Sequence, residues 1–170
     1  MKKIFFFFLF SFFLIGGTGF CENFPKSTGK SFCKNLPDSI KNFHAVGKCE
    51  YTDINLTNQY TNQYIREAHR EYESGNKKII LHIVEGPPAL AQLNTFHNIV
   101  SIETADTIVK KIEFQGFQSL VHYNKIEKSG NVIIILNEQK PKVLLINYTN
   151  VPMEEIVDII KHEINLEKFK

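Results

Sequence analysis

The chain has 170 residues, of which 43% are hydrophobic, with three cysteines and no tryptophan. This length supports one domain with a tail and excludes a large multidomain enzyme. The formal net charge of +2 comes from the N-terminus, because Lys2 and Lys3 are the only charged residues before Glu22. Removing residues 1–19 takes away two of the 20 basic residues and leaves 18, which equals the number of acidic residues. A neutral chain without a basic cluster argues against nucleic acid as a partner.

The N-terminus has the pattern of a secretory signal peptide, which we assign to residues 1–19. Its two lysines precede the segment 4–15, which is apolar except for one serine. This segment is shorter than the roughly 18 residues that span a bilayer, and small residues follow it at 16–19. We therefore expect an exported protein, periplasmic or secreted, without a transmembrane span after cleavage. The alternative is an uncleaved membrane anchor.

The three cysteines are Cys21, Cys33 and Cys49. In an oxidising compartment, Cys33 and Cys49 are candidates for a disulfide that closes a loop of about 15 residues. Cys21 lies where a lipidated cysteine would follow a signal peptide, but the bulky Phe20 before it departs from the small residue of such signals. Lipidation of Cys21, giving a lipid-anchored envelope protein, is therefore the minority interpretation. Sequence alone does not fix the pairing, and three unpaired cysteines are the alternative.

Residues 20–47 are rich in Lys, Ser, Asn, Gly and Pro and show no sustained period. We interpret this segment as an irregular lead-in or tether, and we expect the folded domain at 48–170. The sequence Thr28-Gly29-Lys30-Ser31 resembles the end of a phosphate-binding loop. That motif requires a glycine where Phe24 stands, so nucleotide binding at this segment is rejected.

Two alternating runs, 64–72 and 79–84, flank a turn that contains Gly75-Asn76. This pattern predicts a β-hairpin in which the numbers of opposite residues add up to 151. His69 then lies opposite His82, on the face away from the apolar pairs. The alternative is a helix over 64–73, because its Glu, Arg and Ala residues favour a helix.

The remaining elements are predicted from period and from start signals. Pro87-Pro88 starts a helix, and Pro152 starts a second helix with an apolar face. Strands are expected at 107–115, 117–124, 131–136 and 143–147. The run 132–136 is apolar on both faces and belongs in the middle of a sheet with cover on each side. The order predicts a single small α+β domain, with a mainly antiparallel sheet of about five to six strands and two helices packed on one face.

No catalytic motif is found, which argues against an enzyme. The argument is weak, because catalytic triads are assembled in space rather than in sequence. Among the six histidines, His69 and His82 are the only pair that local geometry brings together, with Glu67 and Glu71 on the same face. These four side chains are the candidate ligands of a divalent metal such as zinc, or a pH-responsive pair. Two imidazoles are fewer than the ligands that a zinc site needs, and a solvated hairpin face is the alternative.

We therefore expect an exported domain without enzymatic activity or cofactor, which binds an envelope protein or a small ligand through its sheet. One alternative is a metal-binding or pH-responsive periplasmic protein that uses His69 and His82. A second alternative is a hydrolase whose catalytic residues meet only in the fold.

Overall fold

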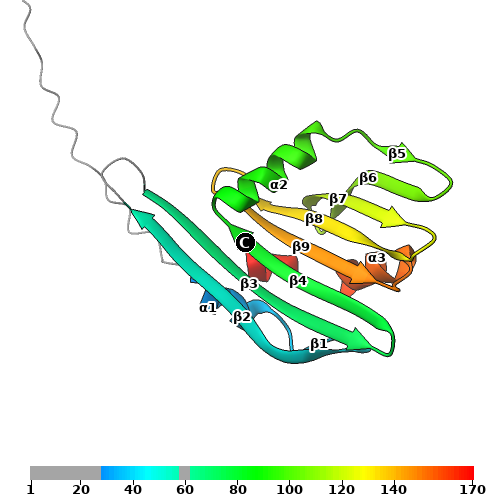
Figure 1. The fold of residues 1–170 in the computed structure, drawn as a ribbon, viewed down its shortest axis with the longest axis horizontal. Helices are drawn as coiled ribbons and strands as arrows, with labels where there is room; N and C mark the ends of the chain where they lie inside the picture. The colour runs from blue at the N-terminus through cyan, green and yellow to red at the C-terminus, as the bar shows by residue number, and fades with distance from the viewer. Residues whose placement is uncertain (1–27, 58–61) are drawn as a thin grey trace, which may run out of the picture.

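The computed structural model describes residues 28–57 and 62–170 (Figure 1). The predicted signal peptide at 1–19 and the candidate lipidation site Cys21 lie outside the described residues. No helix in the described part of the chain is long and apolar enough to cross a membrane.

One antiparallel sheet of nine strands dominates the fold, in the order β1-β2-β3-β4-β9-β8-β7-β6-β5. The strands are β1 Ser39–Ile40, β2 Phe43–Thr57, β3 Asn62–Ser74, β4 Lys77–Glu85, β5 Ile102–Glu103, β6 Thr107–Phe114, β7 Phe117–Asn124, β8 Ser129–Asn137 and β9 Lys142–Thr149. The helices are α1 Gly29–Asn35, α2 Pro87–Asn98 and α3 Met153–His162, followed by the 3₁₀ helix η1 Leu166–Phe169.

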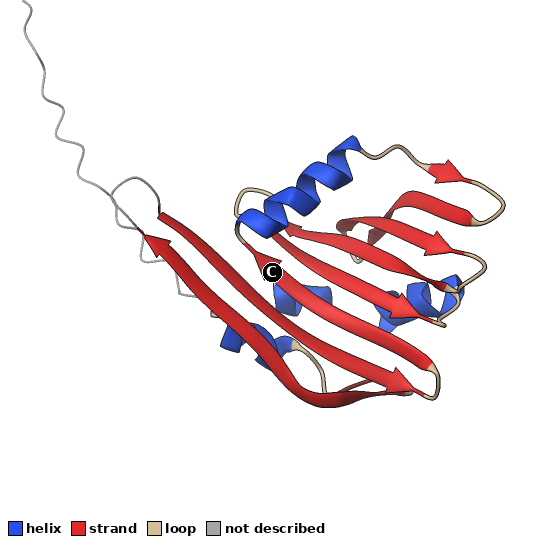
Figure 2. Ribbon diagram, in the orientation of Figure 1, coloured by secondary structure: helices blue, strands red, loops and turns tan. Residues whose placement is uncertain are grey.

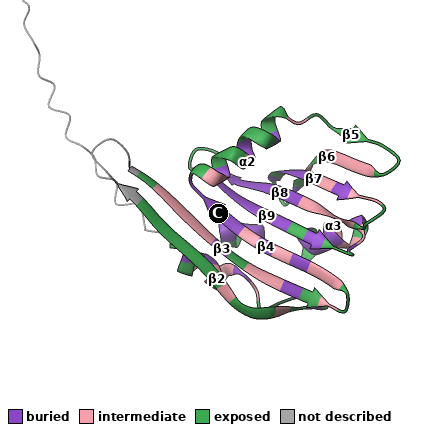
Figure 3. Ribbon diagram, viewed as in Figure 1, coloured by how far each residue is buried: buried purple, intermediate pink, exposed green. Residues whose placement is uncertain are grey.

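The helices cover both faces of the sheet (Figure 2). The larger core, which we call the main face, contains alternate side chains of the central strands together with α1, α3 and η1. The opposite face, which we call the open face, carries only α2 and a smaller cluster of buried residues. Figure 3 shows the two layers: burial is greatest in the central strands and least along β2.

The prediction of five to six strands with two helices on one face is wrong. The strand count was too low because β2, which lies next to the two-residue edge strand β1, is long and largely exposed, so it lacks the alternation that marks a half-buried strand. The short strands β1 and β5 have two residues each and leave no sequence pattern. The single-face arrangement fails at β8, where Val132 and Ile134 enter the main core while Ile133 and Ile135 enter the smaller one.

The hairpin prediction is confirmed, and the helix alternative for 64–73 is wrong. Strands β3 and β4 pair with Tyr72 opposite Ile79, Ala68 opposite Ile83 and His69 opposite His82. The two residue numbers in each pair add up to 151, as predicted. Tyr72 and Ile79 are fully buried in the main core, so burial of this face overrides the helix propensity of the segment.

Residues 28–47 of the expected lead-in at 20–47 belong to the fold. Its residues form α1, β1 and the start of β2, and Phe32, Leu36, Ile40 and Phe43 join the main core. Helix α1 begins with a capping box in which Thr28 and Ser31 exchange hydrogen bonds. The predicted disulfide is confirmed: Cys33 of α1 is bonded to Cys49 of β2, with their Cα atoms 5.7 Å apart. A disulfide is compatible with an exported protein.

The turn between β6 and β7 holds the C-terminal segment on the main face. Gln115 adopts a left-handed backbone conformation with φ 51°. Its Nε2 donates to the carbonyl oxygens of Ile160, Lys161 and Ile164, at 2.9, 3.2 and 2.7 Å. Its Oε1 accepts from the N–H of Leu166 at 3.2 Å. The side-chain amide of Gln115 therefore supplies hydrogen-bond partners to the backbone carbonyls at the end of α3 and to the backbone N–H at the start of η1.

Candidate functional site

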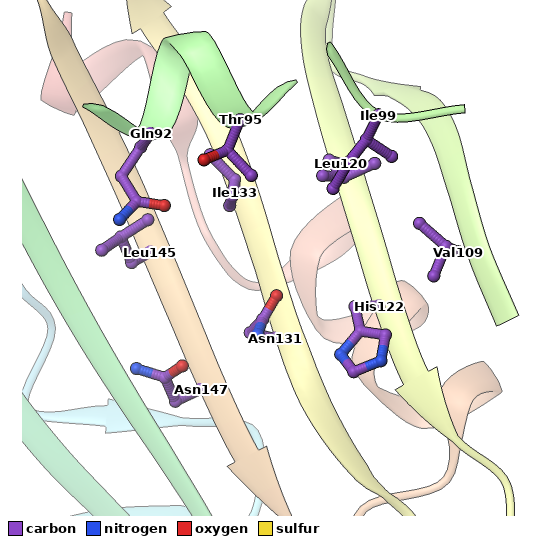
Figure 4. A pocket seen from close by; sticks show the side chains of 10 residues that line it. All are labelled: Gln92, Thr95, Ile99, Val109, Leu120, His122, Asn131, Ile133, Leu145 and Asn147. Carbon is purple, nitrogen blue, oxygen red and sulfur yellow. The ribbon is translucent and has the colours of Figure 1, made fainter. Parts of the chain in front are cut away.

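A cleft of about 500 Å³ lies on the open face between α2 and strands β6 to β9. Its volume falls within the range of about 300–1,000 Å³ that is usual for small-molecule sites. Five lining residues are apolar and five are polar (Figure 4): Ile99, Val109, Leu120, Ile133 and Leu145, and Gln92, Thr95, His122, Asn131 and Asn147. An apolar floor with a few polar groups is the usual composition of a ligand site.

The direction of α2 creates the cleft. The chain leaves β4 at Glu85 and turns at Gly86, whose φ of 101° suits glycine alone. A β-carbon at Gly86 would lie 2.1 Å from the carbonyl oxygen of Tyr64, so a side chain has no room there. Pro87 then begins the helix, as predicted. The helix buries Ala89, Leu93 and Phe96 against one end of the open face and leaves the rest of that face uncovered.

Strand register arranges the floor of the cleft in two parallel rows. Asn147 pairs with Asn131, and Asn131 pairs with His122, which makes a polar row across β9, β8 and β7. Two residues along each strand, Leu145 pairs with Ile133 and Ile133 with Leu120, which makes an apolar row. Figure 4 shows the apolar row nearer to α2 and the polar row beyond it. Adjacent residues on one face of a strand are two positions apart, so both rows face the cleft.

The polar side chains of the cleft form almost no hydrogen bonds within the described fold. Asn131, Asn147, Gln92 and His122 form no side-chain hydrogen bond with another described residue, and Thr95 bonds only to its own helix, at Ala91 O. Carboxamides and a neutral imidazole each offer a donor and an acceptor. The cleft therefore presents both kinds of hydrogen-bonding group to a molecule that enters it.

The neighbouring charges are held outside the lining. Lys111 is paired with Leu120 in the sheet, but its Nζ lies 4.6 Å from the centre of the Phe96 ring. On the other side of the cleft, Lys78 forms an ion pair with Glu71. Among the residues that the structure describes, no Asp, Glu, Lys or Arg lines the cleft.

The predicted histidine pair lies on the open face beside the cleft. The ring centres of His69 and His82 are 5.8 Å apart, and His82 is paired with Leu145 of the cleft floor. His69 Nε2 lies 3.4 Å from Glu50 Oε2, and His82 Nε2 lies 3.6 Å from Glu67 Oε2. Burial lowers the pKa of His82 below its ordinary value, while the carboxylate of Glu67 opposes the shift.

The structure brings three of the four predicted metal ligands together, namely His69, His82 and Glu67. The fourth, Glu71, forms an ion pair with Lys78. Within 28–57 and 62–170, no group of three or more His, Cys, Asp or Glu side chains is arranged to hold a metal ion. The metal site stays a prediction, and the cleft is the better supported site.

A second polar row lies at one end of the main face. Glu85 is paired with Arg66 on one side and with Lys142 on the other, and Arg66 Nη1 lies 3.4 Å from Glu85 Oε1. Burial lowers the pKa of Lys142, and burial next to Glu85 raises the pKa of Tyr64. Opposite charges in this row compensate one another within the core. We therefore assign the row a structural role.

Sequence reasoning missed the polar row of the cleft. Asn131 stands at the start of an apolar run, Asn147 at the end of another, and His122 is one of six histidines. Only the pairing of β7, β8 and β9 places them side by side. The available signal was the interruption of apolar strands by uncharged polar residues at positions that face one side of the sheet.

No protein family model matches the chain, and neither a curated protein nor a solved structure matches it.

Proposed function

We propose that the protein is an exported, non-enzymatic domain that binds a small ligand in the cleft between α2 and the sheet. One observation carries the proposal: an apolar floor borders a row of hydrogen-bonding side chains that have no partner among the described residues. In the polar row, His122 and Asn131 are half-buried and Asn147 is exposed. Half-buried polar groups are normally paired, so the unpaired side chains of His122 and Asn131 in a concave site favour a ligand.

The lining of the cleft favours binding over hydrolysis. His122 is the one histidine among the described lining residues, and no carboxylate among them lies beside it. A histidine acting as a general base is usually oriented by a third group, most often a carboxylate. The described residues of the cleft supply no such group, which supports the interpretation as a binding protein.

The cellular location is part of the proposal. A signal peptide at 1–19 would deliver the chain to the periplasm or to the medium, where the Cys33–Cys49 disulfide forms. Cleavage after Gly19 would remove the apolar segment 4–15. The N-terminal sequence of the mature protein, and the absence of lipid on Cys21, test this part.

The binding site is tested by amide NMR spectra of the purified protein, titrated with a fragment set of uncharged, anionic and cationic aromatic compounds. We expect shifts concentrated at the amides of Thr95, Asn131 and Asn147. The variant Thr95→Trp places an indole at the mouth of the cleft and should abolish the shifts. Asn94→Trp is the matched control, because Asn94 is an exposed neighbour on α2 that does not line the cleft.

Two results would refute the proposal. One is fragment binding that persists unchanged in Thr95→Trp. The other is a wild-type protein in which no fragment shifts the cleft amides. Thermal unfolding of both tryptophan variants, measured in parallel, shows that each retains the fold.

A further inference from the structure

We infer that the cleft selects an uncharged ligand: a flat apolar body of about two fused rings with carbonyl, hydroxyl or amide groups along one edge. This inference rests on the proposed function, because it assigns the chemical class of the molecule that the cleft binds. Shape, charge and hydrogen-bonding capacity of the lining support it separately.

The two rows determine the shape of the ligand that the cleft accepts. Neighbouring strands lie about 4.8 Å apart, so the rows span about 10 Å from β7 to β9. Residues two positions apart on a strand are about 7 Å apart, which separates the polar row from the apolar one. Leu120, Ile133 and Leu145 thus support an apolar surface, and His122, Asn131 and Asn147 meet one edge of it. Two fused six-membered rings match this rectangle.

The absence of charge in the lining determines the ligand's charge. None of the ten lining residues is Asp, Glu, Lys or Arg. Lys111, which is paired with Leu120 of the cleft floor, is held over the ring of Phe96, and Lys78 is held by Glu71. A charged ligand would lose hydration on this apolar floor and meet no opposite charge in return, which is costly. An uncharged ligand avoids that cost.

The polar row is suited to groups that donate and accept. Each carboxamide of Asn131 and Asn147 offers two N–H donors and one acceptor oxygen, and the ring nitrogens of His122 add further hydrogen-bonding groups. These groups match carbonyl, hydroxyl and amide functions spaced along one edge of the ligand. A ligand without them would leave the row unpaired when it covers the cleft, which is unfavourable.

Three probes of one shape test the inference: β-naphthamide, β-naphthoate and naphthalene. The amide and the carboxylate are nearly isosteric and differ in charge, and naphthalene lacks the polar edge. Affinities are measured by NMR titration of the purified protein at about pH 8, where a histidine of ordinary pKa is neutral. We expect naphthamide to bind at least about tenfold more tightly than naphthoate, and more tightly than naphthalene.

Two variants assign the selectivity to the polar row. Asn131→Leu keeps the branched shape of the side chain, with slightly more volume, and removes its hydrogen bonds, so naphthamide affinity should fall about fivefold, while naphthalene binding is kept. Asn94→Leu makes the same change on the outer side of α2 and should leave all three affinities unchanged. Equal melting temperatures of the variants would exclude a general loss of structure.

The outcomes separate the inference from the proposed function. Naphthoate binding as tight as that of naphthamide, with both lost in Thr95→Trp, overturns the ligand class and leaves the cleft as the binding site. Probe binding that is unaffected by Thr95→Trp overturns the cleft itself. Loss of naphthamide affinity in Asn131→Leu, but not in Asn94→Leu, supports both.

Discussion

Shortening Gln115 by one methylene, in the variant Gln115→Asn, tests how the C-terminal segment is held on the main face. The side-chain amide of Gln115 contacts three carbonyls at the end of α3 and the N–H of Leu166. Asparagine tolerates the left-handed backbone at this position, so the substitution leaves the turn unstrained. Its shorter side chain does not reach the same partners.

The expected loss follows from the number of hydrogen bonds. The Gln115 amide has two N–H groups, which donate to three carbonyls, and one oxygen, which accepts one hydrogen bond. Together these amount to about three net hydrogen bonds. Each contributes about 1 kcal/mol, and the exposed position of Gln115 reduces the total. We therefore expect Gln115→Asn to lower the free energy of unfolding by about 2 kcal/mol. Gln118→Asn is the matched control: Gln118 is exposed on β7, and its change should lie within about 0.5 kcal/mol.

Urea unfolding gives the free energies, and amide hydrogen exchange gives the local effect. The N–H of Leu166 should exchange faster in Gln115→Asn, because it loses its acceptor. The reasoning is refuted if Gln115→Asn and Gln118→Asn are equally stable and the exchange of Leu166 is unchanged. Faster exchange with unchanged global stability would show that the end of the chain opens independently of the sheet.

Three further predictions concern the disulfide, a crowded glycine and a half-buried imidazole. Replacing Cys33 and Cys49 by Ser should cost about 3 kcal/mol in urea unfolding, and a reducing agent should destabilise the wild type but not this double variant. Gly130→Ala should lower the melting temperature strongly, because its β-carbon would lie 2.0 Å from the carbonyl oxygen of His122; an unchanged melting temperature contradicts that packing. Burial depresses the pKa of His82 in the folded state, so the unfolded state takes up a proton first as pH falls through the ordinary value of 6.5. The wild type should therefore lose stability relative to His82→Gln between about pH 8 and pH 5.5, and parallel pH profiles would disprove it.

Local sequence patterns predict the elements whose partners are close in the chain. The β3–β4 register follows from one turn at Gly75-Asn76, and α2 and α3 follow from their prolines and apolar spacing. The double-sided burial of β8 follows from its unbroken apolar run. Each of these signals is complete within about a dozen residues.

The elements that were missed depend on distant contacts. Strand β2 forms because β3 pairs with it along its length, whereas its own exposed residues show little period. Helix α1 has seven residues and is fixed to β2 by a disulfide and to the core by Phe32. The cleft likewise combines a helix with four strands, and no sequence spacing encodes the neighbourhood of Asn131 and Asn147. Non-local pairing is therefore the information that the sequence patterns lacked.

The division of the core by the sheet has a consequence for substitutions in the cleft. Helix α2 rests on a cluster that is separate from the larger core held by α1, α3 and η1. Substitutions in α2 and in the residues that it covers would change the lining of the cleft. The larger core on the main face would keep its packing. Under the proposed function, substitutions at Gln92 and Thr95 should alter ligand preference while the strand order and the larger core are kept.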